Sequence, residues 1–210
     1  MRLSFNVISP LLTVVLITLT LGLSTSSTST ADVSQKSFGA WLSLLRKEAS
    51  GSGIQQKTLD SALNDLQPVS RVIELDNNQP EAKLTFDQYL SRILSEERIA
   101  RGRKKLTDCR RLMAKIAEAY GVQPRFLVAL WGVETDFGRV TGSFPVIDSL
   151  VSLIYGGRRS SFFRKELLHA LRILDEGHIS HARMKGSWAG AMGQLQFMPS
   201  PLDIEAILLY

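Results

Sequence analysis

Apolar side chains recur every three or four positions along most of the chain, which is the spacing of one face of an α-helix. Between residues 38 and 68 this pattern predicts two helices, the first stopped by Gly51 and Gly53 and the second by Pro68. Their buried positions are expected to be Phe38, Trp41, Leu42 and Leu45, then Leu59, Ala62, Leu63 and Leu66. Residues 76–80, Asp-Asn-Asn-Gln-Pro, are typical of a turn, so a connector is expected there.

The helical spacing continues beyond this connector. Residues 146–155 are apolar enough for a buried helix, and Ser160 is placed to cap the next one, whose inward positions are Phe163, Leu167, Leu171 and Leu174. An earlier helix would end at Gly121 and bury Leu112, Met113, Ile116 and Tyr120. No alternating apolar and polar strand of convincing length occurs, so the predicted fold class is mostly α.

The N-terminus has the composition of an export signal. Residues 3–31 carry no charge after Arg2, residues 11–23 are almost all apolar or Thr, and Ser29 and Ala31 have the small side chains that signal peptidase accepts. We therefore expect residues 1–31 to be a signal peptide and the protein to be periplasmic. An uncleaved membrane anchor is the alternative. The single cysteine, Cys109, is far from the cleavage point, so lipid attachment there is excluded.

Composition narrows the function classes only slightly. The 210 residues are 44% hydrophobic and 21% charged, and 25 Lys and Arg against 20 Asp and Glu give a formal charge of +5. This is globular usage, without the dense positive charge of a dedicated nucleic-acid binder. Residues 92–115 are locally basic, which indicates a solvated face or, at most, affinity for an anionic polymer. His178 and His181 lack a third ligand at matching spacing, so no metal site is expected.

One carboxylate stands out as a candidate general acid. Pro124 suits the first turn of a helix in which Leu127, Leu130, Trp131 and Glu134 would share one face. The helix should end near residues 137–138, which places Glu134 in its last turn. Burial beside Trp131 and the negative end of the helix dipole would then both favour the protonated carboxyl that a general acid needs. The alternative is a glutamate that only pairs with Arg139 or Arg125.

Two glycine-rich segments could line a ligand site. Residues 156–160, Gly-Gly-Arg-Arg-Ser, form a predicted turn with two adjacent guanidinium groups. Residues 186–193, Gly-Ser-Trp-Ala-Gly-Ala-Met-Gly, are small enough for backbone to approach a ligand closely. With Ser187, Trp188, Gln194 and Gln196 this second segment has the hydroxyl, indole and amide groups of a carbohydrate cleft. A loop that packs helices together would use the same small residues.

These motifs resemble the lytic murein transglycosylase B family. The similarity rests on Trp131-Gly-Val-Glu-Thr-Asp-Phe-Gly138, Ser143-Phe-Pro145, Tyr155-Gly-Gly-Arg-Arg-Ser160, Gly186–Gly193 and Gln196-Phe-Met-Pro-Ser200. It implies a lysozyme-like helical catalytic domain over residues 32–200. By resemblance, Glu134 is the catalytic acid/base and Ser187 orients the N-acetyl group of the sugar. Residues implied to line the glycan and peptide subsites are Arg158, Arg159 and Gln196, with Trp188 and Met192 as neighbours.

The resemblance also implies the chemistry and the partners. The expected reaction cleaves the β-1,4 bond between N-acetylmuramic acid and N-acetylglucosamine and leaves 1,6-anhydro ends, so one carboxylate suffices. Asp136 is then expected to cap the helix or pair with Arg139, and Asp148 to be structural. No cofactor and no metal are expected. Peptidoglycan glycan strands are the expected partner of a monomer, with no nucleic acid, and with membrane contact only through an uncleaved N-terminal segment.

After Ser200 the sequence departs from the family pattern. Residues 201–210 resemble a divergent tail, as a truncation or frameshift would produce, and the family's calcium-loop-like segment does not follow. The expectation is that the far, C-terminal part of the groove is missing. One alternative is therefore a catalytically impaired murein-binding remnant. A second is a basic helical module that binds anionic lipid or nucleic acid through residues 92–115.

Overall fold

The computed structural model describes residues 30–78, 84–157 and 159–200, with side chains from Ser37 onward. Residues 1–29 of the predicted signal peptide, Arg158 and the predicted tail at 201–210 lie outside the described residues. Within the described part, no helix combines the length and apolar character that crossing a bilayer requires.

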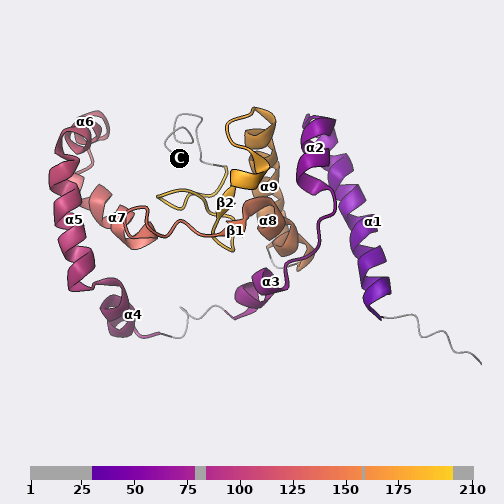
Figure 1. The fold of residues 1–210 in the computed structure, drawn as a ribbon, viewed down its shortest axis with the longest axis horizontal. Helices are drawn as coiled ribbons and strands as arrows, with labels where there is room; N and C mark the ends of the chain where they lie inside the picture. Colours follow the sequence, from indigo (N-terminus) through magenta and orange to yellow (C-terminus); the bar gives the residue numbers. More distant parts are fainter. Residues whose placement is uncertain (1–29, 79–83, 158, 201–210) are drawn as a thin grey trace, which may run out of the picture.

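The described chain is mostly helical, as predicted (Figure 1). Two-residue strands β1 and β2 pair antiparallel, with Phe144 opposite Gly186 and Pro145 opposite Lys185. Strands this short show no alternation in the sequence, which is why they were not predicted. In chain order the elements are α1 (Thr30–Gly51), α2 (Gln56–Leu63), α3 (Ser70–Asn77), α4 (Phe86–Ile93), α5 (Glu96–Asp108), α6 (Arg110–Tyr120), α7 (Pro124–Thr135), β1 (Phe144–Pro145), α8 (Val146–Tyr155), α9 (Ser160–Asp175), the 3-10 turn η2 (His181–Arg183) and β2 (Lys185–Gly186).

Helices α1, α2, α3, α8 and α9 share one continuous core, and we call this part the large-core region. Helix α8 packs against α9 and α3, and α2 packs against α1 and α9. The predicted inward positions of α1, α2 and α9 are buried, apart from Trp41 and Leu174, which are partly buried. Burying a large apolar side chain contributes about 1.5–3 kcal/mol, so this core is the main source of stability.

Helices α4 to α7 form a second region, which we call the small-core region; Figure 1 shows it on the opposite side of the β1–β2 pair. Its buried apolar cluster consists of Met113, Val128 and Phe137. The prediction that Leu112 and Tyr120 are buried is wrong, because their exposed fractions are 57% and 78%. Of the described residues on that face of α6, only Met113 is fully buried, and its cluster lies against α7.

Several predicted boundaries need correction. Helix α2 ends at Leu63, well before Pro68, and Asp76 is buried in the last turn of α3 although a connector was predicted there. Ser160 is the first residue of α9, and Arg159 occupies the capping position in a left-handed conformation. Gly121 does follow α6 with a left-handed backbone (φ +68°), as predicted.

Candidate active site

Helix α7 carries the candidate acid. Pro124 lies in its first turn and Glu134 in its last, as predicted, but the helix ends at Thr135, slightly earlier than expected. The predicted burial of Glu134 is wrong, because its side chain is exposed. The side of α7 that faces inward carries Val128, Gly132 and Thr135, whereas Leu130 is 47% exposed on the side of Glu134. The carboxyl is thus open to solvent and to any ligand that approaches the end of α7.

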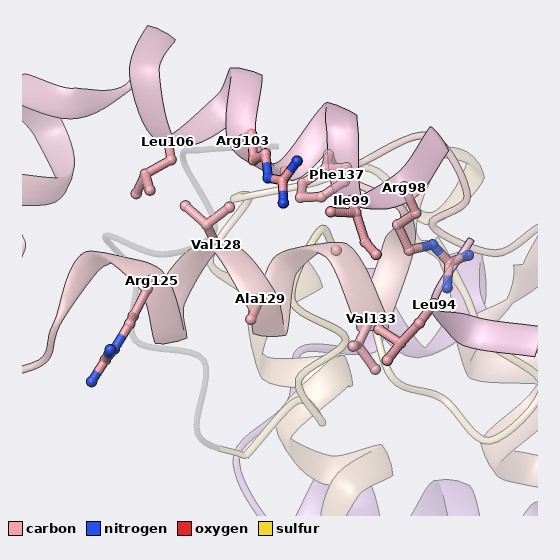
Figure 2. Close-up of a pocket in the computed structure, with 12 residues that line it drawn as sticks. Leu94, Arg98, Ile99, Arg103, Leu106, Arg125, Val128, Ala129, Val133 and Phe137 are labelled. Atoms are coloured by element: carbon pink, nitrogen blue, oxygen red, sulfur yellow. The ribbon is translucent and has the colours of Figure 1, made fainter. Parts of the chain in front are cut away.

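The hollow between α5 and α7 is a different place. It has a volume of about 250 Å³ and an almost entirely apolar wall, with Val133 on its α7 side (Figure 2). The Phe137 ring reaches between Gly102 of α5 and Gly132 of α7. Glu134 is not among the residues that line it. We therefore place the candidate active site at the C-terminal end of α7 and the loop beside it, and not in this hollow.

The chain leaves α7 through an unusual turn. Asp136, Phe137 and Gly138 all have positive φ angles, of 51°, 63° and 83°. Glycine adopts this conformation freely and aspartate tolerates it, but a phenylalanine there is strained. The Phe137 ring is buried over Gly132, where an added Cβ would lie 2.6 Å from the ring Cζ. Packing of the ring in the small-core region offsets the cost of its backbone.

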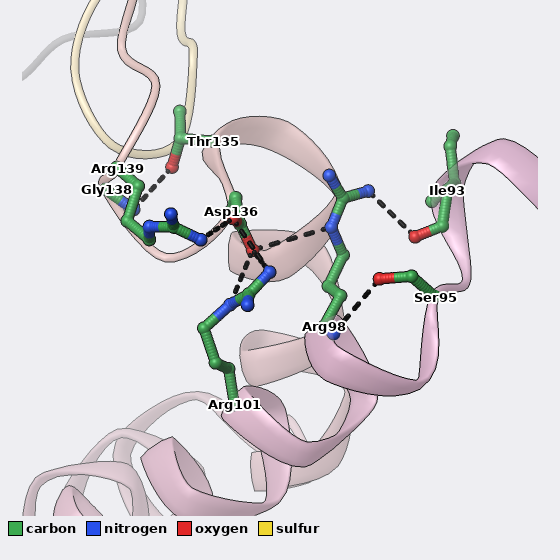
Figure 3. Close-up of polar contacts among 8 residues, drawn as sticks. All are labelled: Ile93, Ser95, Arg98, Arg101, Thr135, Asp136, Gly138 and Arg139. Carbon is green, nitrogen blue, oxygen red and sulfur yellow. Dashed lines mark hydrogen bonds and ion pairs between the residues drawn. The ribbon is translucent and has the colours of Figure 1, made fainter.

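Asp136 is held by three guanidinium groups (Figure 3). Its carboxylate accepts hydrogen bonds from Arg101 at 2.9 Å and from Arg139 at 2.7 Å, and Arg98 lies 3.5 Å away. Burial alone would raise the pKa of Asp136, but the Arg101 hydrogen bonds and the three positive charges outweigh it and lower the pKa below its usual value. The predicted pairing with Arg139 is confirmed, and Asp136 also caps α7.

Thr135 joins the end of α7 to a loop distant in sequence. Its buried Oγ1 donates to the carbonyl oxygen of Gln194 at 2.6 Å and accepts from the Gly138 N–H at 2.9 Å. One helical turn earlier, the Trp131 indole N–H donates to the Gln194 side-chain oxygen at 2.9 Å. These bonds hold Glu134, which lies between Trp131 and Thr135 in the sequence, beside the loop that starts at Gly186.

Small residues bring the backbones of this site into contact. At Gly142 (φ +94°) an added Cβ would lie 2.1 Å from the Gly186 carbonyl oxygen, so the segment after α7 runs against the start of the loop. Ser187 closes the loop on itself: its N–H donates to the Ala191 carbonyl at 2.8 Å, and its Oγ accepts from the Ala191 N–H at 3.1 Å. Because Oγ acts as an acceptor there, the hydroxyl hydrogen can be directed toward a ligand.

The other predicted residues of this loop differ in what they can reach. The Gln196 amide donates to the carbonyls of Thr141 and Gly193, at 2.9 and 2.8 Å, and so supports the loop from within. Trp188 is partly buried against the large core. Met192 is 1% exposed and its side chain packs in the large core, so its predicted place as a neighbour of the site stays a prediction.

Arg159 is fixed elsewhere. It pairs with buried Asp76 of α3 at 3.3 Å and lies over the Phe163 ring, 5.1 Å from the centroid. No interaction of the described residues links Arg159 directly to Glu134. Through Trp131 and Thr135, the helical turn that carries Glu134 contacts Gln194 of the loop that also contains Ser187 and Gln196, whereas Arg159 is held by other partners.

Three residues that form these contacts were not identified from the sequence. Thr135 lies within the motif around Glu134, yet nothing in the motif shows that its hydroxyl reaches Gln194. Arg101 lies in the basic run interpreted as a solvated face, and Asp76 in the supposed connector. Their partners are 35 to 83 positions away, so no local signal could have found them.

Metal ligands are not gathered here. Among the described residues, no group of three or more His, Cys, Asp or Glu side chains could hold a metal ion. His181 instead pairs with Asp148 at 3.8 Å, an interaction that raises the pKa of the imidazole even though partial burial opposes it. Asp148 thus has the structural role predicted for it.

Sequence and structure comparisons agree on one family. Residues 37–207 of this chain match a protein family described as the Transglycosylase SLT domain. Membrane-bound lytic murein transglycosylase B of Escherichia coli K12 is 28% identical over 165 residues, which cover 74% of this chain and 46% of that protein. The chain thus spans about half the length of this relative.

Solved structures are similar over the same part of the chain. SltB3 of Pseudomonas aeruginosa, determined in complex with NAG-NAM-pentapeptide, superimposes with a TM-score of 0.72 at 39% identity, over 78% of this chain and 44% of that one. Escherichia coli Slt35, determined in complex with calcium, gives a TM-score of 0.68 at 28% identity, over 76% and 51%. From the helical fold, the motifs and these matches together, the chain belongs to the transglycosylase SLT domain family.

Proposed function

We propose that the protein is a lytic murein transglycosylase that cuts peptidoglycan glycan strands between N-acetylmuramic acid and N-acetylglucosamine and leaves 1,6-anhydro ends. The observation that carries the proposal is the exposed carboxyl of Glu134 at the end of α7, held beside the Ser187 loop by Thr135 and Trp131. Family membership and the peptidoglycan fragment bound by SltB3 support the choice of substrate.

In this proposal Glu134 acts first as an acid. Its proton passes to the glycosidic oxygen as the bond from that oxygen to the anomeric carbon breaks. The acetamido oxygen of the same sugar attacks the anomeric carbon and takes up the developing positive charge. In this proposal the Ser187 hydroxyl donates to this acetamido group and orients it. A bound strand would also cover Glu134, and exclusion of water disfavours the charged form of a carboxyl group.

Glu134 then acts as a base. Its carboxylate takes the proton from the C6 hydroxyl, whose oxygen attacks the anomeric carbon and displaces the acetamido oxygen. The anhydro ring closes and Glu134 regains the proton it started with, so no second carboxylate and no water are consumed.

The place of action is also a proposal. We propose that residues 1–31 direct export and that the protein works in the periplasm, where its substrate lies. The absence of charge over residues 3–31, the apolar run at 11–23 and the small residues Ser29 and Ala31 support this.

The test is digestion of purified sacculi followed by mass spectrometry of the fragments. The wild-type protein should release anhydro-muropeptides, one water lighter than hydrolysed fragments, and Glu134→Gln should release none while still cosedimenting with sacculi. Glu118→Gln, an exposed glutamate of α6, is the matched control and should keep full activity.

Each of the other possible results would contradict a different part of the proposal. Product from Glu134→Gln would contradict the assignment of the acid. Wild-type protein that binds sacculi without releasing product would contradict the enzyme and leave a murein-binding protein. Absence of both binding and product would contradict murein as the ligand.

A further inference from the structure

Asp136 lies two residues after the proposed acid and does more than end a helix. Its carboxylate is 11% exposed and receives Nε and Nη2 of Arg101 at 3.1 and 2.9 Å, and Nη1 of Arg139 at 2.7 Å. Both Arg101 and Arg98 belong to α5, so the side chain ties the end of α7 to another helix (Figure 3). A bidentate arginine fixes direction as well as distance.

The backbone needs this support. Two consecutive L-residues, Asp136 and Phe137, have φ angles in the left-handed region, which costs about 1 kcal/mol or more for each. The turn returns N–H groups to the last carbonyls of α7, from Asp136 to Gly132 at 3.1 Å and from Phe137 to Trp131 at 3.2 Å. Such a conformation persists only where its surroundings hold it.

The same turn is anchored a second time on its other side. Thr135 binds the Gln194 carbonyl of the Ser187 loop, while Asp136 binds α5. The last turn of α7, with Glu134 in it, is therefore held between one anchor on the loop and another on the small-core region. Removal of the Asp136 carboxylate would leave three guanidinium groups facing one another and release one anchor.

We infer that Asp136 is the positioning residue of the active site: through its arginine partners it holds the left-handed turn that sets the place of Glu134 relative to the Ser187 loop. The inference rests on the proposed function. It assigns Asp136 no contact with the substrate and no part in proton transfer.

Three substitutions separate charge from backbone. Asp136→Asn keeps the shape and the tolerance for a left-handed backbone but removes the charge, Asp136→Gly keeps only the backbone freedom, and Asp136→Ala keeps neither. Asp108→Asn is the matched control, because Asp108 forms an exposed ion pair with Lys104, at 2.8 Å, within α5.

Turnover of sacculi is the first measurement, made at a temperature where circular dichroism shows every variant folded. Asp136→Ala should lower kcat by about tenfold or more with little change in KM, since a small displacement of a catalytic group has effects of this size. Asp136→Asn should recover part of the loss, and Asp108→Asn should match the wild type. Wild-type kcat in folded Asp136→Ala would overturn the inference.

A second measurement does not depend on activity. The Trp131 indole N–H binds Gln194, so its NMR signal reports contact between α7 and the loop. We expect this signal to shift, and the Gly138 amide to exchange faster, in Asp136→Ala but not in Asp108→Asn. An unchanged signal overturns the inference even if the wild type proves inactive, and an inactive wild type with a shifted signal contradicts only the proposed function.

Discussion

The two regions of the molecule are stabilised in different ways. In the large-core region, α8 and α9 bury apolar side chains from end to end, whereas the described small-core region has three buried apolar residues and leaves Phe126 and Leu94 more than half exposed. The small-core region relies more on charged contacts, such as Asp136 with its arginines and Lys105 over the Trp131 ring at 4.9 Å. The proposed acid belongs to the helix with the weaker core.

This comparison teaches where the site can be disturbed. Core packing is dense and responds to lost volume, whereas polar anchors respond to charge, geometry and pH. We expect the large-core region to set global stability, and the polar contacts of Thr135 and Asp136 to set the precision of the site.

The largest expected effect comes from the large core. Leu167→Ala removes a fully buried side chain of α9 and should lower the free energy of unfolding by about 2–5 kcal/mol. Met113→Ala removes a buried side chain of the small core. It should lower the free energy of unfolding by less than about 2 kcal/mol, because the exposed surface beside it can relax into the space. Urea denaturation measures both, and equal losses would contradict the distinction between the regions.

The contact between α7 and the Ser187 loop should respond next. Thr135→Val keeps the shape of the side chain but removes its bonds to Gln194 and Gly138, so we expect a loss of about 1–3 kcal/mol. Thermal unfolding followed by circular dichroism gives the value. Thr107→Val, which removes an exposed bond to Arg103 on α5, should change stability by less than about 0.5 kcal/mol.

Glycine substitutions should have opposite signs in the two regions. An alanine at Gly132 would bring its Cβ to 2.6 Å from the Phe137 ring, and the displaced ring should cost about 1–3 kcal/mol. An alanine at Gly39 in α1 meets no atom within 4 Å and should stabilise by about 0.5–1 kcal/mol through helix propensity. Chemical denaturation that shows the same sign for both would contradict the packing of Phe137 on α7.

The smallest effects concern pH. The pKa of Asp136 is lowered on folding. Its contribution to the free energy of unfolding is therefore present above about pH 4 and is lost as pH falls through the folded pKa. The pKa of His181 is raised, so its contribution is fully present below about pH 6.5 and is lost as pH rises through the folded pKa. Acid should therefore loosen the small-core region, and mild alkali the large-core region.

Hydrogen exchange at several pH values can separate the two regions. Asp136→Asn should remove the acid effect in α7, and His181→Gln should remove the alkaline effect near α8. The His181 contribution should stay below about 1 kcal/mol because the pair with Asp148 is partly exposed. If His181→Gln left the alkaline effect intact, the pair would not be its cause.

Sequence reasoning worked best where burial follows a regular period. The predicted inward positions of α9 and the predicted bounds of α8 agree with the structure. Helix α9 packs on the core along one side, and α8 is surrounded by the core. It failed at α6 and α7, where Leu112 and Glu134 were assigned to a buried face. The period there is genuine, but the apolar stripe has little to pack against among the described residues.

The candidate site was likewise predicted only in part. The motif around Glu134 and the small residues at 186–193 were identified from local sequence, since the chemistry and the close backbone contacts depend on residue types near one another in the chain. The predicted subsite role of Gln196 remains a prediction, while its amide is seen to bind Thr141 and Gly193. Arg158 cannot be placed among the described residues.

The sequence by itself determined the helical class, the inward stripes of the large core, the turn after α6 and the candidate acid with its neighbours in the motif. Only the tertiary structure decided that Glu134 is exposed, that Thr135 reaches Gln194, and that Asp136 draws Arg98 and Arg101 from α5. The physical reason is range: helix propensity and periodic burial act over a few residues, whereas hydrogen bonds and ion pairs between distant segments exist only after the chain has folded.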